Sequence, residues 1–164
     1  MDGRLAVTDQ FDPGAMQVLR RRPDIYWQST DALMPQPEQM DFIAHMLHPD
    51  VWTVAGTLDG GIFGFVEFNR RTSIGAEIHC GFHPQFRGRV ARAVVQYAIA
   101  QAFETKGLLK LWAPIPSDNR AALFGARHLG FHEEGRLTRA IVRQVKDGPP
   151  LRDLVLMSLE KVQH

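Results

Sequence analysis

The sequence predicts an α+β fold, a mixed α/β sandwich in which helices are interleaved with a mostly antiparallel sheet. Two observations support this class. Short β-rich segments joined by turn signals occur in the first half and near the end of the chain, and amphipathic helical segments separate the strands in the middle. The length of 164 residues fits one domain, 1–164, and no stretch between residues 5 and 160 has the composition of an interdomain linker.

The first expected elements are helices within residues 13–48, interrupted by prolines. Asp12-Pro13 and Gln36-Pro37-Glu38 resemble helix starts, with proline at or near the first turn. Residues 51–57 and 62–69 are β-rich, and the Leu58-Asp59-Gly60-Gly61 sequence between them is typical of a hairpin turn. We therefore expect an N-terminal helical region followed by a hairpin.

A third strand is expected at residues 74–82, where apolar and polar residues alternate. The alternation places Glu77, His79 and His83 on one face. The opposite, apolar face would hold Ile74, Ala76, Ile78, Cys80 and Phe82. On this interpretation Cys80 is a core residue and not a nucleophile.

The second half predicts two further helices and three strands. Pro84 ends the third strand, and residues 85–89 lead into an amphipathic helix that ends near Lys106-Gly107. A short apolar strand follows at residues 108–113. Ser117-Asp118-Asn119 supplies caps for a helix to Leu129, with Gly130 as its C′ residue. A hairpin of residues 134–145 and 151–159, with a turn at 146–150, completes the chain.

Composition narrows the function classes. Apolar residues are 45% and charged residues 23% of the chain, as in globular proteins. A single cysteine excludes an intramolecular disulfide framework, so a cytoplasmic location is expected. No apolar run approaches the roughly 18 residues of a membrane span, and residues 1–14 are too acidic and broken for a signal peptide.

Charge is divided unevenly along the chain. The net charge is +1, yet residues 1–84 sum to −5 and residues 85–143 to +6. The total indicates no nucleic-acid or membrane partner, whereas the basic middle segment fits an anionic ligand or, equally, a solvated helix face. The run Arg20-Arg21-Arg22 is interpreted as a solvated helix end.

The sequence of residues 74–105 predicts a strand, a glycine-containing loop and a long helix. A helix N-terminus exposes unpaired N–H groups that bind phosphate, and Gly88 would let the backbone approach such a ligand closely. Arg87, Arg89 and Arg92 add positive charge there. The loop is neither a P-loop nor GxGxxG. A plain strand-to-helix turn with solvated arginines remains the alternative.

These motifs resemble the GNAT acetyltransferases. Gln85-Phe86-Arg87-Gly88-Arg89-Val90 is similar to that family's pyrophosphate loop, although Val90 stands where Gly or Ala is preferred. Asn119-Arg120-Ala121-Ala122 and Leu129-Gly130-Phe131 match its Asn-x-x-Ala/Ser and Leu-Gly-Phe element in order and spacing. The resemblance covers residues 50–160. Phe131, Glu134-Gly135 and Asp153 are most similar to the branch that acetylates protein N-termini, including ribosomal proteins, and to small phage-encoded members.

The resemblance implies acetyl-CoA bound where two neighbouring strands of the sheet splay apart, with helices on both faces. Backbone N–H groups of Arg87, Gly88, Arg89, Val90 and Ala91 would hold the pyrophosphate. The strand that ends at Phe82 would pair with the pantetheine, and Asn119 would orient the cofactor or a water. No metal is expected, because His79 and His83 lie roughly 13 Å apart along a strand and His45 and His48 lack a third ligand.

An amine nucleophile requires a group that accepts its proton. Glu77, in an Ala-Glu-Ile context similar to that of histone-acetylating members, is one candidate, and His79 on the same face is the other. An exposed strand carboxylate and a hydrogen-bonded strand histidine are the alternatives. The tyrosine that many members place seven residues after the asparagine is replaced by Ala126.

We therefore expect an acetyl-CoA-dependent N-acetyltransferase that acts by direct attack of a primary amine in a ternary complex. The alternative is a catalytically idle CoA-binding module that serves an assembly. The acceptor, an amine-bearing small molecule or a protein N-terminus, would be bound by residues 13–48, and the sequence is compatible with a homodimer.

Overall fold

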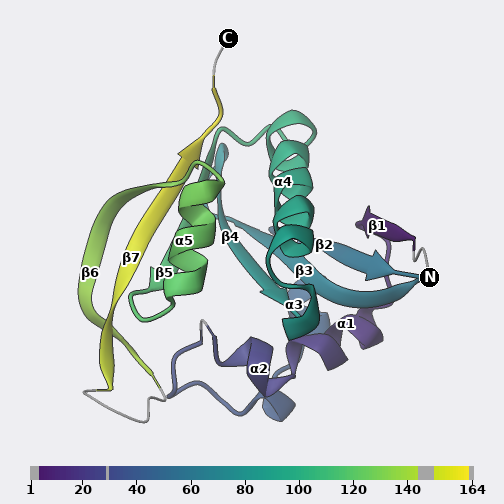
Figure 1. Cartoon of the computed structure of the whole chain (residues 1–164), viewed down its shortest axis with the longest axis horizontal. Helices are drawn as coiled ribbons and strands as arrows, with labels where there is room; N and C mark the ends of the chain where they lie inside the picture. Colours follow the sequence, from purple (N-terminus) through teal and green to yellow (C-terminus); the bar gives the residue numbers. More distant parts are fainter. Residues whose placement is uncertain (1–3, 29, 144–149, 163–164) are drawn as a thin grey trace.

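The computed structural model describes residues 4–28, 30–143 and 150–162. Its centre is a seven-stranded sheet in the order β1-β2-β3-β4-β5-β7-β6 (Figure 1). Among the described strands, β4 and β5 form the one parallel pair, so the sheet is mostly antiparallel as predicted. The strands are β1 (Leu5–Thr8), β2 (Val51–Leu58), β3 (Gly61–Arg70), β4 (Gly75–Phe82), β5 (Lys110–Pro116), β6 (His132–Val142) and β7 (Leu151–Glu160).

Helices pack on both faces of the sheet. The α-helices are α1 (Pro13–Arg20), α2 (Pro23–Tyr26), α3 (Phe42–Met46), α4 (Arg89–Glu104) and α5 (Arg120–His128), and the 3-10 helices are η1 (Pro37–Gln39) and η2 (Pro84–Phe86). Val94 and Ala98 of α4 and Leu123 of α5 belong to one core cluster. Met16 of α1 belongs to a second cluster with Phe65 of β3. The N-terminal helices thus cover the face opposite to α4 and α5.

Glycine and asparagine set the ends of several elements as predicted. The β2–β3 hairpin turns at Asp59 and Gly60, both with positive φ (51° and 83°), as a two-residue primed turn requires. Asn119 caps α5 by accepting a hydrogen bond from Ala122 N, and Gly130 follows that helix with φ 90°. Local side-chain chemistry therefore determines these boundaries.

The structure corrects part of the expected apolar face of β4. Ile74 lies before the strand and is half exposed, and Cys80 is also exposed. Ala76, Ile78 and Phe82 are buried as expected. Strand β1, an edge strand paired with β2, was not predicted, and the expected turn at 146–150 falls largely outside the described residues.

Strands β4 and β5 separate along their length. They pair from Gly75 to Glu77 on β4, opposite residues 110–112 of β5, and then diverge (Figure 1). Beyond Glu77, β4 keeps β3 as its neighbour on one side, while β5 continues along β7 to Pro116. Because α4 follows β4 and α5 follows β5, both helices begin at the open end of this gap.

Candidate active site

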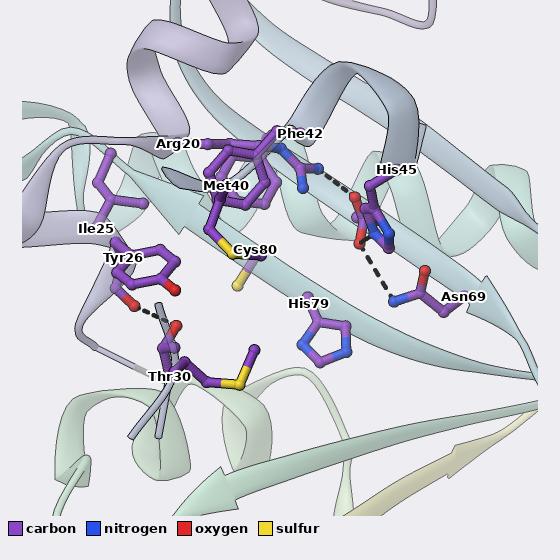
Figure 2. Close-up of a pocket in the computed structure, with 13 residues that line it drawn as sticks. Arg20, Ile25, Tyr26, Thr30, Met40, Phe42, His45, Asn69, His79 and Cys80 are labelled. Atoms are coloured by element: carbon purple, nitrogen blue, oxygen red, sulfur yellow. Dashed lines mark hydrogen bonds and ion pairs between the residues drawn. The ribbon is translucent and has the colours of Figure 1, made fainter. Parts of the chain in front are cut away.

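A pocket of about 350 Å³ lies against the face of β3 and β4 that the N-terminal helices cover (Figure 2). This volume is at the lower end of the usual range for small-molecule sites, about 300–1,000 Å³. The lining comes from residues 20–45 on one side and from the two strands on the other: Arg20, Ile25, Tyr26, Thr30, Met34, Met40, Phe42, His45, Phe65, Glu67, Asn69, His79 and Cys80.

The sheet presents four polar residues next to one another on this face. Glu67 of β3 lies directly opposite His79 of β4, and Asn69 lies opposite Glu77. Directly opposed residues of antiparallel strands have neighbouring side chains. The polar positions of the two strands therefore form one continuous patch beneath the N-terminal helices.

Glu67 is the centre of a buried polar cluster. It is 3% exposed and forms an ion pair with Arg20 of α1, which is itself 5% exposed. His45 Nε2 of α3 lies 2.8 Å from Glu67 Oε1, and Asn69 Nδ2 donates to the same oxygen at 3.2 Å. Thr53 Oγ1 donates to Oε2 at 3.5 Å. The carboxylate thus links α1 and α3 to the sheet.

The cluster keeps Glu67 ionised. Burial alone would raise the pKa of this carboxyl, but the hydrogen bonds and charges of His45 and Arg20 outweigh it and lower the pKa to about 2. The Arg20 guanidinium also lies over the Phe65 ring, 4.1 Å from its centroid, and over the Phe42 ring at 5.6 Å. Arg20 is therefore a buried part of the pocket wall, and its interpretation as a solvated helix end is wrong.

His79 and Glu77 form a hydrogen-bonded pair. His79 Nε2 lies 2.7 Å from Glu77 Oε1, and Arg71 Nη2 lies 3.0 Å from Glu77 Oε2. The bond from His79, with further help from the positive charge of Arg71, lowers the pKa of Glu77 despite its partial burial. His79 lines the pocket, whereas Glu77 does not. In Figure 2 the His79 ring stands apart from the cluster of His45 and Asn69.

An ionised carboxylate only accepts hydrogen bonds, so in the neutral form of the ring the bond to Glu77 makes Nε2 the protonated nitrogen of His79. Nδ1 then carries the lone pair. No described residue forms a hydrogen bond with His79 Nδ1. Glu77 thus holds the imidazole through Nε2, and Nδ1 is available to accept a proton.

Cys80 lies at the open edge of β4. The residue is exposed and contributes to the pocket lining, contrary to the expected core position. The surrounding protein disfavours the thiolate and raises the pKa of Cys80 to about 11. The side chain is therefore neutral at physiological pH and a poor nucleophile.

Residues 27, 28, 30 and 32, on one side of the pocket, form hydrogen bonds with the far half of the sheet and with the start of α5. Arg143 Nη1 donates to Trp27 O at 2.7 Å and to Thr30 O at 3.2 Å. Ala32 N donates to Val142 O at 2.7 Å, and Asn119 Nδ2 donates to Gln28 O at 3.3 Å. This side of the pocket is therefore joined to the N-terminal end of α5, beside the β4–β5 gap, by the hydrogen bond from Asn119.

The loop between β4 and α4 has the predicted form. Gly88 has φ 84° and ψ −125°, and no described atom lies within 4 Å of where a Cβ would stand. The first bond into α4 runs from Arg92 N to Gly88 O at 3.0 Å, which leaves the preceding amides without an intrahelical partner. Val90 packs its side chain against the core, so it does not fill the loop's outer side.

The structure gives other predicted cofactor residues additional contacts. Arg87 Nε donates to Phe82 O at 3.2 Å and Nη2 donates to Asp24 O at 2.8 Å, so its side chain joins the loop to α2. Arg89 is exposed and Ala91 is buried at the start of α4. Their roles toward a cofactor, and that of Asn119, stay predictions.

Sequence reasoning missed Arg20, His45 and Glu67. One signal for Glu67 was present, because Val66 and Phe68 alternate with Glu67 and Asn69, as on a strand with one polar face. Nothing local connects Glu67 with Arg20, which lies 47 residues away in the sequence.

No group of three or more His, Cys, Asp or Glu side chains in the described part of the chain is placed to hold a metal ion. Among these residues, no helix combines the length and the apolar character that crossing a membrane would need.

Comparison with known proteins identifies the family. The sequence profile of the acetyltransferase (GNAT) family matches residues 18–131, well over half of the chain. The chain belongs to this family. The match includes both the pocket residues of the N-terminal helices and the loop around Gly88.

Individual relatives of this GNAT chain are distant. The acetyltransferase plu1384 of Photorhabdus laumondii is 28% identical over 113 residues, which cover 65% of this chain and 76% of that protein. The spermidine N-acetyltransferase of Vibrio cholerae, solved with CoA and spermine, has a TM-score of 0.75 at 17% identity, with 95% of each chain covered. The ribosomal-protein-S5-alanine acetyltransferase of Vibrio fischeri has a TM-score of 0.71 at 15% identity, covering 95% of this chain and 92% of the other. At these identities the two structures establish the shared fold.

Proposed function

We propose that this GNAT protein transfers the acetyl group of acetyl-CoA to a primary amine by direct attack in a ternary complex. The observation that carries the proposal is the Glu77–His79 pair, which stands beside a pocket at the point where β4 and β5 separate. A positioned imidazole next to an opening in the sheet can accept the proton of an amine nucleophile bound there.

The cofactor would lie in the gap between β4 and β5. Beyond Glu77 the edge of β4 facing that gap, up to Phe82, pairs with no described strand, so pantetheine amides can pair with it. The unpaired amides at the start of α4, with no side chain at Gly88, suit the pyrophosphate. Arg87 and Asn119 flank the open end of this gap, one before α4 and the other before α5.

His79 is the proposed general base. Its Nδ1 would accept the proton of the attacking amine, and Glu77 would stabilise the imidazolium that results. Glu77 acts through His79 and is therefore a positioning residue in this proposal. The two candidates that the sequence left as alternatives thus work as one unit.

The reaction balances without a covalent enzyme intermediate. The amine nitrogen forms a bond to the thioester carbonyl carbon, the C–S bond breaks, and CoA leaves as a thiolate. A thiol has a pKa near 8.5 on the cysteine reference, so the thiolate can depart with water as the proton source. The N-terminal end of α5 adds favourable electrostatics.

Thiol release from acetyl-CoA with a panel of primary amines tests the activity. His79→Gln should lower kcat by about 10²–10⁴-fold and remove the rising limb of the pH profile. Glu77→Gln should lower kcat by about 10–100-fold and shift that limb to lower pH, because the imidazolium loses its carboxylate partner. Undiminished activity in both variants would refute the assignment of the base.

The second candidate is a CoA-binding module without catalysis. The observation in its favour is Ala126, where many family members have a tyrosine. Ala126 is 8% exposed and belongs to the core cluster, and its own side chain has no hydroxyl to offer. CoA binding without thiol release for any amine would favour this candidate.

A further inference from the structure

The charged groups of the pocket are paired with one another, and this limits the acceptor that can enter. Glu67 is the sole carboxylate among the described residues that line the pocket. A carboxylate offers about four lone-pair sites. Arg20 and Thr53 use Oε2, and His45 and Asn69 use Oε1. No site remains on this carboxylate for a substrate ammonium.

The other titratable groups facing the pocket supply no negative charge. They are Tyr26 on α2, His45 on α3, and His79 and Cys80 on β4. Packing raises the pKa values of Tyr26 and Cys80, so both are neutral. Because Glu67 is paired with Arg20, the described lining holds no unpaired negative charge.

The remaining walls are apolar and adaptable. Ile25, Met34, Met40, Phe42 and Phe65 line the pocket. Methionine side chains fill irregular space around ligands of varied shape. A second ammonium in the substrate would lose hydration here without meeting a counter-charge, which is costly.

Resting on the proposed function, we propose that the acceptor is a small primary amine whose single amino group is carried on an uncharged apolar body. The amine reaches His79 and the body lies among Met40, Phe42 and Phe65. Polyamines are disfavoured, although the fold is shared with a spermidine N-acetyltransferase. The reason is that the oxygens of Glu67 are occupied by Arg20, Thr53, His45 and Asn69, so none is left for a second ammonium.

The test compares two amines of equal size, n-hexylamine and 1,5-diaminopentane. The first ends in a methyl group where the second carries a second ammonium. We expect kcat/KM for hexylamine to exceed that for the diamine by about 30-fold or more. Spermidine should be used as poorly as the diamine. Equal or better use of the diamine or of spermidine would overturn the inference.

Two variants test the physical cause. Arg20→Met frees lone pairs of Glu67 and gives the pocket one negative charge, so the hexylamine-to-diamine ratio should fall about tenfold or more. Since this variant breaks a buried pair, Met34→Glu provides the same test at an exposed wall position. Met34→Gln is its matched neutral control and should keep the wild-type ratio. An unchanged ratio in Met34→Glu would overturn the inference.

A binding measurement separates this inference from the proposed function. Both amines are titrated calorimetrically into the CoA-bound protein, where no reaction occurs. A dissociation constant for hexylamine that is at least about tenfold lower than that for the diamine supports the inference, even when turnover is absent. In that case the proposed function alone has failed. Equal binding of the two amines, or binding of neither, overturns the inference.

Discussion

The Glu67–Arg20 pair leads to a quantitative prediction about acid stability. Lowering the pKa of Glu67 from 4.5 to about 2 corresponds to about 3 kcal/mol of folding free energy, and the 4% side-chain exposure leaves little solvent screening. Because the folded-state pKa is the lower one, this stability is present above pH 4.5 and is lost as the pH falls toward 2. About 2 of the 3 kcal/mol should be gone by pH 3.

Glu67→Gln removes the carboxylate and leaves the Arg20 charge buried without a partner. We expect a loss of about 3–5 kcal/mol at pH 7. The free energy of unfolding is measured by urea titration at pH 7, 4.5 and 3. The difference between wild type and variant should narrow by about 2 kcal/mol between pH 7 and pH 3, because only the wild type loses this contribution.

Controls separate the buried charge from general effects of substitution. Glu77→Gln removes a carboxylate that is 22% exposed and should cost less than about 1 kcal/mol. The double variant Arg20→Met/Glu67→Met should recover most of the lost stability, because replacing both partners of a buried ion pair often leaves the free energy of unfolding unchanged. A Glu67→Gln variant within about 1 kcal/mol of wild type at pH 7, or one as acid-sensitive as wild type, would refute this reasoning.

Three further predictions concern the cofactor loop, the thiol and the pocket wall. CoA should raise the melting temperature of the protein, and Gly88→Glu should abolish that rise by placing bulk and charge at the pyrophosphate position. Gly88→Ala controls for backbone strain at φ 84°. A full rise in melting temperature with Gly88→Glu would exclude this loop as the cofactor site. Because its pKa is raised to about 11, Cys80 should react with iodoacetamide at pH 8 about 100-fold more slowly than free cysteine, which mass spectrometry can follow. A rate equal to that of free cysteine would contradict the neutral thiol. Arg143→Ala should raise KM for the amine more than for acetyl-CoA, because it releases Trp27 and Thr30; an unchanged amine KM would show that this bracing does not shape the pocket.

Much of the fold could be predicted because local signals determine it. The Asp59-Gly60 turn, the Asn119 cap and Gly130 each act within a few residues, and the alternation from Ala76 to His79 places the polar face of β4. The loop at Gly88 was predictable for the same reason. Strand β1 was missed because four partly exposed residues at an edge have little hydrophobic pattern.

The interior of the pocket could not be predicted from local pattern. Arg20 stands in a run of three arginines that resembles a solvated helix end, and its burial depends on Glu67, which is distant in sequence. His45 is placed by the same carboxylate. Such pairings follow from how α1 and α3 dock on the sheet, and a single sequence carries little information on docking.

The same ion pair that limits the acceptor also supports the helices that form the pocket. Helices α1, α2 and α3 have eight, four and five residues, too short to be stable in isolation. Their position therefore depends on contacts with the sheet, and Glu67 supplies two of these through Arg20 and His45. A change at Glu67 or Arg20 would alter stability and selectivity together. A change at the exposed Met34 can alter the charge of the pocket without releasing the helices, so it is the position at which selectivity can be examined separately from folding.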